Sequence, residues 1–295
     1  MIHVVGHTAI DHLIRVPRLP APNHSTYITG HRVFFGGGAA NIAAGIARLG
    51  GAVTLLSAVG GEFPGGDYDR WLDQLGVAKS FYRVDDARTP TAFVITDDSG
   101  DQVTYFEWGA STIFRDTEPP AGLDFVHLAT ADPVFNVKMA EKSRFCTFDP
   151  GQDLIRYSAG DLQVILENCD ILFANRHEVS GMCDMLGISE TGLVDMVPAA
   201  VFTMDSRGST LHADGTETFV PAVRVEAADP TGAGDAYRAG FLTAHTRGVD
   251  LVRCCRVGAV TASFTVERPG TQTNLPDWAT MRKRYAAAFP GDTPP

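Results

Sequence analysis

Short runs of Val, Ile and Phe recur along the chain, and most are followed by a segment whose apolar residues have helical spacing. The runs do not alternate with polar residues, which is typical of strands buried on both faces of a parallel sheet. We therefore predict an α/β fold with helices on both faces of the sheet. The predicted strands are Ile2–Val5, Val53–Val59, Phe125–Leu128, Phe145–Phe148, Ile171–Ala174 and Val201–Met204, and the predicted helices cover residues 39–49, 66–75, 133–142, 176–186, 235–247, 250–267 and 277–288.

Two stretches interrupt this alternation of strands and helices. Residues 12–35 contain three prolines followed by mixed polar and apolar positions, and residues 90–109 have the pattern of a β-hairpin. In the hairpin, Thr91–Thr96 and Gln102–Trp108 are the strands and residues 97–100 form the turn. We predict that these stretches form a small β-sheet lid on a single domain that covers residues 1–295. The alternative is that they extend the edge of the main sheet.

The charge balance limits the classes of partner. The chain has 24 Lys and Arg against 35 Asp and Glu, a formal net charge of -11, so we expect no nucleic-acid groove and no basic membrane-binding face. Such a protein would bind a phosphorylated ligand through backbone N–H groups or a metal ion. The five cysteines include no Cys-x-x-Cys pair, which disfavours a zinc site. Because there is no long apolar segment and no signal-peptide pattern, we expect a cytoplasmic protein.

The segment from Asp229 to Ala236 carries the strongest chemical signal. Gly232, Ala233 and Gly234 stand where a helical pattern begins, and such a start directs backbone N–H groups and the positive end of a helix dipole at one point. Asp235 follows in the first turn, beside this anion hole. A carboxylate there could accept the proton of a hydroxyl that attacks a bound phosphoryl group. The alternative is a glycine-rich turn in which Asp235 only caps the helix.

A second glycine-rich segment, Gly36–Asn41, opens another predicted helix. Gly37 and Gly38 would let a ligand approach the backbone closely, and Asn41 can exchange hydrogen bonds with a sugar hydroxyl. Asp11 lies just past the predicted first strand, where open α/β sheets bind ligands, and its carboxylate could take two vicinal hydroxyls. A flexible loop and a surface carboxylate are the alternatives for these two features.

Asn175 and Glu178 follow another predicted strand and stand three residues apart, so they face the same way on a first helical turn. Their oxygens could hold a hydrated Mg²⁺ through its water ligands, or they could only cap the helix. The chain has no Gly-x-x-x-x-Gly-Lys-[Ser/Thr] segment, which excludes a P-loop NTPase. It also has no Gly-x-Gly-x-x-Gly after the first strand, which disfavours dinucleotide binding.

Asp229–Asp235 resembles the C-terminal signature of the ribokinase-like (PfkB) carbohydrate kinases, and Gly36–Gly50 resembles the N-terminal signature of that family. The two segments stand in the family's order, about 190 residues apart, and Asn175–Glu178 between them matches its Asn-x-x-Glu motif. The resemblance runs from the first strand to about Pro276. It implies a ribokinase-like three-layer α/β/α fold with a central mostly parallel sheet and a small β-sheet lid. It also implies Mg²⁺-dependent transfer of the ATP γ-phosphate to a sugar hydroxymethyl group.

The resemblance further implies a role for each candidate residue. Asp235 would be the catalytic base, and Gly232, Ala233 and Gly234 would form the anion hole. The sugar would be held by Asp11, Gly37, Gly38 and Asn41. The nucleotide would be bound by Asn175, Glu178, Thr203, Gly208 and Thr231, with Asn175 and Glu178 acting on Mg²⁺ through water. In the nucleotide-binding turn, Asp205 replaces the first glycine of the family's Thr-x-Gly-x-x-Gly, and Asp tolerates a positive φ better than most residues.

Two classes of acceptor stay open. His7–Asp11 and Phe148–Gln152 resemble archaeal-type nucleoside kinases of the family, and aromatic residues of the lid could stack on a nucleobase. These aromatic residues are Tyr27, Phe34, Phe35, Tyr105, Phe106 and Trp108. The first class is a ribonucleoside such as inosine, guanosine, cytidine or adenosine, phosphorylated at its 5′-hydroxyl. The second is a sugar or sugar phosphate such as ribose, ribose 1-phosphate, fructose or fructose 6-phosphate, whose phosphate could be bound by Arg15, Arg32 or Arg88.

A third alternative is a non-catalytic ligand-binding relative, although such a protein has no need of Asp235. The resemblance leaves open a homodimer formed through the lid and the use of a monovalent cation.

Overall fold

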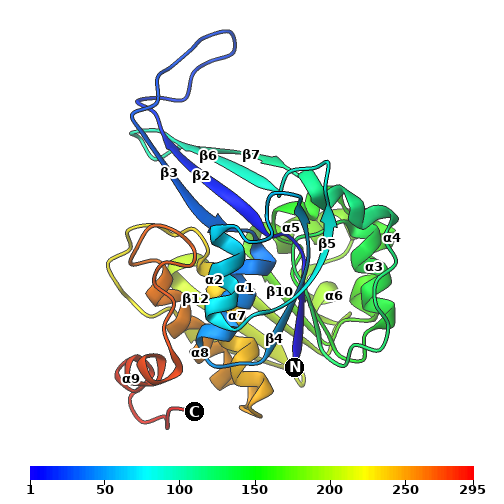
Figure 1. The fold of residues 1–295 in the computed structure, drawn as a ribbon. Coiled ribbons are helices and arrows are strands. Elements are labelled where there is room, and N and C mark those ends of the chain that lie inside the picture. Colours follow the sequence, from blue (N-terminus) through cyan, green and yellow to red (C-terminus); the bar gives the residue numbers. More distant parts are fainter.

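A nine-stranded sheet is the middle layer of the fold (Figure 1), in a computed structural model that describes residues 1–295. Its strands are β1 (Ile2–Val5), β4 (Val53–Gly60), β5 (Ala78–Val84), β8 (Val126–Leu128), β9 (Cys146–Phe148), β10 (Ile171–Asn175), β11 (Ala199–Thr203), β12 (Gly208–Ala213) and β13 (Thr216–Pro221). The order across the sheet is β13-β12-β11-β10-β9-β8-β1-β4-β5. All neighbours are parallel except β11 with β12 and β12 with β13. The predicted mostly parallel sheet is therefore confirmed.

Helices cover both faces of this sheet and complete the three layers (Figure 1). One face carries α1 (Gly38–Arg48), α2 (Asp67–Leu75), α7 (Ala233–Thr246), α8 (Leu251–Thr265) and α9 (Trp278–Ala288). The other carries α3 (Pro133–Lys142), α4 (Ala159–Glu167), α5 (Arg176–Leu186) and α6 (Glu190–Val194). Short 3₁₀ helices span Gly109–Asp116, Gly151–Arg156 and Asp205–Arg207. Each face buries its own apolar core, and the burial of that area is what holds the layers together.

Every predicted strand and helix is present, with its ends displaced by only a few residues. The sequence analysis missed the edge strands β5 and β13, the antiparallel strand β12 beside β13, and the helices α4 and α6. Strand β5 alternates exposed and partly buried positions because it has a neighbour on one side only, so it lacks the continuous apolar run of a central strand. Helix α6 has five residues, which is too short for a helical period to show in the sequence.

A second sheet of four strands stands over one edge of the main sheet, and we call it the lid sheet (Figure 1). Its strands are β2 (Ala9–Arg15), β3 (Gly30–Gly36), β6 (Thr91–Thr96) and β7 (Gln102–Glu107), in the order β3-β2-β6-β7. Because it is hydrogen-bonded separately from the main sheet, the alternative of an edge extension is wrong. The lid sheet begins at Ala9 rather than at residue 12, so Asp11 belongs to a lid strand and not to a loop.

The carboxyl end of β1 is where the two sheets meet. Strand β1 lies between β4 and β8, so the chain turns to opposite sides of the sheet at this point, and open α/β sheets bind ligands beside such a switch. Residues 6–8 lead directly from β1 into lid strand β2. Three helices, α1, α5 and α7, begin after Gly37, Asn175 and Gly232, and all three of these residues line one cavity. None of the helices is long and apolar enough to cross a membrane.

Candidate active site

One cavity of about 940 Å³ lies between the lid sheet and the carboxyl ends of the parallel strands. The sequence analysis singled out thirteen site residues from five separate segments, and the fold brings all of them to the wall of this cavity. They are Asp11, Gly37, Gly38, Asn41, Asn175, Glu178, Thr203, Gly208, Thr231, Gly232, Ala233, Gly234 and Asp235. A volume of this size is at the upper end of small-molecule sites, as two ligands would need.

The start of α7 has the geometry of an anion hole. Gly232 precedes the helix with a φ of 78°, a left-handed conformation that glycine adopts without strain. A Cβ at this position would also lie 2.7 Å from Cγ2 of Thr271. The turn leads into the helix at Ala233, so the N–H groups of Gly234 and Asp235 belong to the first turn, where no intrahelical acceptor exists. These N–H groups and the helix dipole face the cavity and are suited to an anion.

Asp235 is held beside the anion hole by a hydrogen-bond network that spans three segments. Asn41 of α1 donates from Nδ2 to Oδ2 of Asp235 at 2.8 Å. Oδ1 of Asn41 accepts from the hydroxyl of Thr271 at 2.8 Å and from Nε2 of Gln272 at 2.9 Å. This fixes which atom of the Asn41 amide faces Asp235 and leaves one Nδ2 hydrogen for another acceptor. Asn41 thus orients the carboxylate and retains a donor for a ligand.

Replacing Asn41 with alanine should slow any reaction that uses Asp235 without unfolding the chain. A hydrogen bond to a charged group contributes about 1.5–3 kcal/mol, so we expect Asn41→Ala to reduce kcat by about 10- to 100-fold. Steady-state kinetics measures this, with Asn168→Ala as control, because Asn168 bonds only the carbonyl of Val164 at the end of α4. Equal losses of kcat in the two variants would show that the Asn41 contact does not orient Asp235.

Asp11 faces the same cavity from lid strand β2. Burial and, to a smaller extent, the nearby carboxylate of Asp235 together raise the pKa of Asp11 to about 7. Burial also raises the pKa of Asp235, while the Arg238 guanidinium and the Asn41 hydrogen bond act in the opposite direction. Two neighbouring carboxyl groups that both have raised pKa values are found more often at functional sites than in structural ion pairs.

Asn175 and Glu178 lie at the start of α5 and form a reciprocal cap. Oδ1 of Asn175 accepts from the N–H groups of His177 and Glu178, and Oε2 of Glu178 accepts from the N–H of Asn175 at 2.7 Å. The cap that the sequence analysis gave as an alternative therefore exists. It does not exclude a ligand role, because both residues line the cavity and Oε1 of Glu178 has no protein partner. A carboxylate oxygen of this kind suits a hydrated Mg²⁺.

The turn after β11 forms the far end of the cavity. Thr203, Asp205 and Gly208 all line it. Asp205 has a φ of 51°, so the left-handed turn that the family builds with glycine is present here with aspartate. The Asp205 carboxylate is exposed and lies 3.4 Å from Nη2 of Arg176. The turn expected from the sequence is thus retained although its first glycine is absent.

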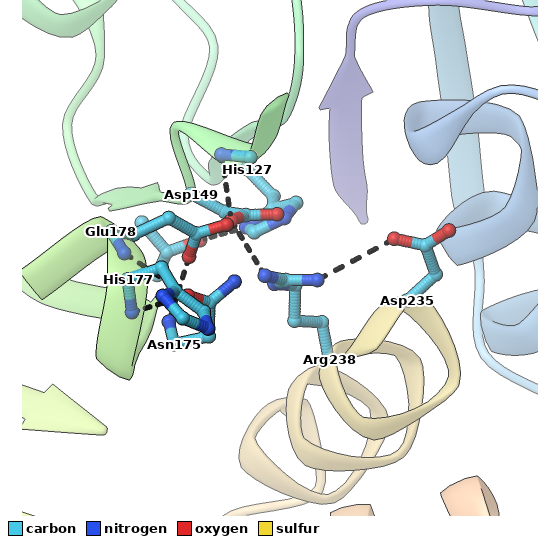
Figure 2. A network of polar contacts seen from close by, with 9 residues as sticks. His127, Asp149, Asn175, His177, Glu178, Asp235 and Arg238 are labelled. Carbon is cyan, nitrogen blue, oxygen red and sulfur yellow. Dashed lines mark hydrogen bonds and ion pairs between the residues drawn. The ribbon is translucent and has the colours of Figure 1, made fainter. Parts of the chain in front are cut away.

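Two residues that the sequence analysis did not single out occupy the centre of the site. Arg238, one turn after Asp235 on α7, lies between Asp235 and Asp149 (Figure 2). Its Nη2 is 2.6 Å from Oδ1 of Asp149 and its Nη1 is 3.4 Å from Oδ1 of Asp235. Burial raises the pKa of Asp149 to about 8, against the lowering effect of Arg238. A sequence signal existed, because Arg238 is at the i+3 position from Asp235 and Asp149 directly follows a buried strand.

His7 is a further lining residue that the sequence analysis did not assign. Its Nδ1 is 2.9 Å from the hydroxyl of Ser111, and its Nε2 is 3.0 Å from Oδ2 of Asp153. Its ring centre lies 4.9 Å from that of Phe106 and 4.7 Å from that of Trp108. The imidazole therefore packs against the end of lid strand β7 where the lid sheet meets the body.

The aromatic surface expected in the lid is mostly absent from the cavity. Of the six residues named from the sequence, only Phe106 lines it. Tyr27 and Tyr105 are 70% and 65% exposed, and Phe35 stacks on Tyr68 with ring centres 4.3 Å apart. Alternate residues of a strand point to opposite faces, which is why neighbouring aromatic residues cannot all face one ligand. Arg15, Arg32 and Arg88 do not line the cavity either.

Comparisons with known proteins agree with this geometry. The model of the pfkB family of carbohydrate kinases matches residues 1–278. The chain is 45% identical over 301 residues to a nucleoside kinase of Methanothermobacter thermautotrophicus, an alignment that covers 99% of this chain and 97% of that protein. The crystal structure of a nucleoside kinase of Methanocaldococcus jannaschii, an archaeal member of the ribokinase family, matches with a TM-score of 0.93 and 41% identity, covering 97% of this chain and 98% of the other.

A more distant solved structure has the same fold. The nucleoside kinase of Burkholderia thailandensis in complex with inosine matches with a TM-score of 0.90 and 26% identity, covering 98% of this chain and 97% of that chain. The same protein was also solved in complex with ADP-inosine. All of these similarities extend over nearly the full length of the chain.

Proposed function

The chain belongs to the pfkB family of carbohydrate kinases, and from that premise we propose that it transfers the γ-phosphate of ATP to the 5′-hydroxyl of a ribonucleoside. The observation that carries the proposal is the meeting of Asp235, Asp11 and the start of α7 in one cavity. A base, a carboxylate for hydroxyl groups and an anion hole are what phosphoryl transfer to an alcohol requires. The similarity to several nucleoside kinases supports the acceptor class.

The proposed step runs as follows at these atoms. Asp11 accepts hydrogen bonds from the 2′- and 3′-hydroxyls, and Asn41 donates its remaining Nδ2 hydrogen to the acceptor. Asp235 takes the proton of the 5′-hydroxyl, whose oxygen forms a bond to the γ-phosphorus. The bond from that phosphorus to the β,γ-bridging oxygen breaks, and its electron pair leaves with ADP. The N–H groups at the start of α7 stabilise the negative charge on the leaving and transferred groups.

Mg²⁺ fits the proposed site through the chemistry of its donors. Oε1 of Glu178 is free of protein partners, and the carboxylates of Asp149 and Asp235 raise the local negative charge. Asn175 and Glu178 would hold the ion through its water molecules, and the ion would offset the charge of the ATP phosphates. The nucleotide would extend toward Thr203, Gly208 and Thr231, which line the same cavity.

The wall on the lid side favours a nucleoside over a sugar phosphate. Apart from Asp11, the residues that the lid sheet contributes to it are small, neutral or aromatic, namely Ala92, Val94, Gln102, Thr104 and Phe106. No lysine lines the cavity, and its two arginines are Arg238, which is paired with carboxylates, and the exposed Arg224. A phosphorylated acceptor would therefore meet no free cation on the lid side, whereas a nucleobase can pack against apolar groups and an aromatic ring.

A coupled assay of ADP release tests the acceptor class. We expect turnover with ATP and Mg²⁺ on inosine, guanosine, cytidine or adenosine, with kcat/KM far above that for ribose, ribose 1-phosphate, fructose or fructose 6-phosphate. Turnover confined to sugars or sugar phosphates would contradict the nucleoside proposal while leaving the kinase chemistry in place. Binding of ATP without turnover of any acceptor would favour the non-catalytic alternative.

The raised carboxylate pKa values predict the pH dependence of activity. Asp235 must be ionised to accept a proton, and burial shifts its pKa upward, so kcat/KM should fall as pH decreases through this raised pKa. Protonation of Asp11, which has a pKa of about 7, lowers kcat/KM over the same acid range, because the protonated group is a poorer acceptor for the two sugar hydroxyls. The acid limb of log kcat/KM against pH should therefore lie well above about 3.9, the pKa of an exposed aspartate. A profile that stays flat down to about pH 5 would contradict the assignment of a buried carboxylate base.

A further inference from the structure

Arg238 is positioned to contact a bound ligand as well as to pair with one carboxylate. It is 9% exposed and lines the cavity, yet only one of its nitrogens makes a short contact, the 2.6 Å bond from Nη2 to Asp149. Nη1 lies 3.4 Å from Asp235, which is longer than a normal charged hydrogen bond. Nε is buried and has no hydrogen-bond partner. The guanidinium is thus anchored at one end and only loosely held at the other.

The loosely held end of Arg238 lies over the anion hole. A Cβ built on Gly234 would be 2.8 Å from Nη1 of Arg238 and 3.6 Å from its Cζ, so the guanidinium lies directly above the backbone of the first turn of α7. An anion bound to the N–H groups of this turn would therefore meet the guanidinium as well. Figure 2 shows the Arg238 head group on the line between Asp235 and the pair Asp149 and Glu178. Because Asn175 and Glu178 belong to the proposed nucleotide side, this line joins the base to the phosphates.

The charges that surround Arg238 favour a role in offsetting the negative charge of a bound ligand. Four carboxylates, of Asp11, Asp149, Glu178 and Asp235, line the cavity away from its rim, and a nucleoside triphosphate would add further negative charge. Arg238 is the only buried arginine on the wall and cannot lose its proton under physiological conditions. A planar guanidinium can contact two oxygens of a phosphoryl group at once, and other phosphotransferases use an arginine on the transferred group in this way.

We propose that Arg238 is a catalytic residue whose guanidinium contacts the γ-phosphoryl group during transfer, and that Asp149 is the positioning residue that aims it. This inference rests on the proposed function, because it assigns the transferred group as its ligand. Arg238 forms and breaks no covalent bond in the step. It balances charge on the phosphoryl oxygens while the proton moves to Asp235 and the electron pair leaves with ADP.

Binding of a γ-phosphoryl mimic tests the contact without any acceptor. Isothermal calorimetry compares ADP with ADP plus beryllium fluoride, in the presence of Mg²⁺, for the wild-type chain and Arg238→Gln. We expect ADP to bind both proteins with similar affinity, and beryllium fluoride to tighten binding at least tenfold more in the wild type. Equal tightening in both proteins would overturn the proposal. This arm gives an answer even if no tested acceptor is phosphorylated, so a failure of the proposed acceptor class is distinguishable.

Turnover provides the second arm. Arg238→Gln should lower kcat by about 100-fold or more while the KM for the acceptor changes less than threefold, and Arg238→Lys should recover part of the loss. Arg256→Gln is the control, since Arg256 is paired with Asp292 near the C-terminus and does not line the cavity. If Arg238→Gln fails to fold because Asp149 loses its partner, the double variant Asp149→Asn with Arg238→Gln removes both charges together. A folded double variant with wild-type kcat would overturn the proposal.

Discussion

Asp235→Asn should abolish phosphoryl transfer while leaving the nucleotide-binding wall in place. Asparagine has nearly the same shape and can still bond to Asn41 or Arg238, but it cannot accept a proton. General base catalysis contributes about 10²–10⁴-fold, so we expect kcat to fall within or beyond that range. Steady-state kinetics measures the loss, and calorimetry with ADP should give an affinity within a few fold of the wild type. The change also removes one negative charge next to Asp11, so the pKa of Asp11 should move downward.

A matched control for this substitution is Asp250→Asn. Asp250 also lies at the start of a helix, where its side chain accepts from the N–H of Arg253, but it is outside the cavity. Asparagine caps helices about as well as aspartate, so we expect wild-type kcat. If Asp235→Asn retained the wild-type rate while Asp250→Asn did too, the base assignment would be wrong and another residue would have to accept the proton.

Asp11→Ala should have its main effect on the acceptor. The Asp11 carboxylate is proposed to take two vicinal hydroxyls, and each hydrogen bond to a charged group contributes about 1.5–3 kcal/mol, so kcat/KM for a ribonucleoside should fall by about 100-fold or more. The affinity for ADP should stay the same, because Asp11 lies on the lid strand β2 and not on the nucleotide side. The control is Asp101→Ala, an exposed aspartate before lid strand β7.

Combining Asp11→Ala with a substrate that lacks the two hydroxyls gives a thermodynamic cycle analogous to a double-mutant cycle. A 2′,3′-dideoxynucleoside lacks both hydroxyls, so the wild type should use it about as poorly as Asp11→Ala uses the ribonucleoside. If Asp11 binds these hydroxyls, the two losses should not add when they are combined. Additive losses would place Asp11 elsewhere in the reaction and would contradict its role in holding the sugar.

The sequence predicted the layers of the fold and the members of the site better than it predicted their contacts. Buried parallel strands such as β8 and β10 are continuous apolar runs that can be recognised locally. The glycine-rich starts of α1 and α7 are also local patterns. A turn with a positive φ favours glycine, and glycines can be recognised directly in the sequence. The thirteen candidate residues therefore could be named before the fold was known, and they share one cavity.

Contacts between distant segments could not be predicted in this way. Asp149 and Arg238 are 89 positions apart, and their ion pair depends on how β9 and α7 pack across the sheet. The links of Asn41 to Thr271 and Gln272 span 230 and 231 positions. For the aromatic residues of the lid, the sequence analysis predicted ligand contacts that the structure mostly lacks. Their composition suggested a stacking surface, but only the register of the strands decides which face each ring occupies, and that register leaves Phe106 alone in the cavity.

The most direct test of the account is the position of the phosphate in the product. The protein is incubated with inosine, ATP and Mg²⁺, and the proton-coupled ³¹P NMR spectrum of the new phosphomonoester is recorded. The account predicts a triplet, because phosphorus attached at the 5′ position couples to the two protons of that carbon. A doublet, which indicates phosphate on the 2′- or 3′-oxygen, would contradict it, and so would the absence of any new phosphomonoester from nucleosides under conditions in which ribose is phosphorylated.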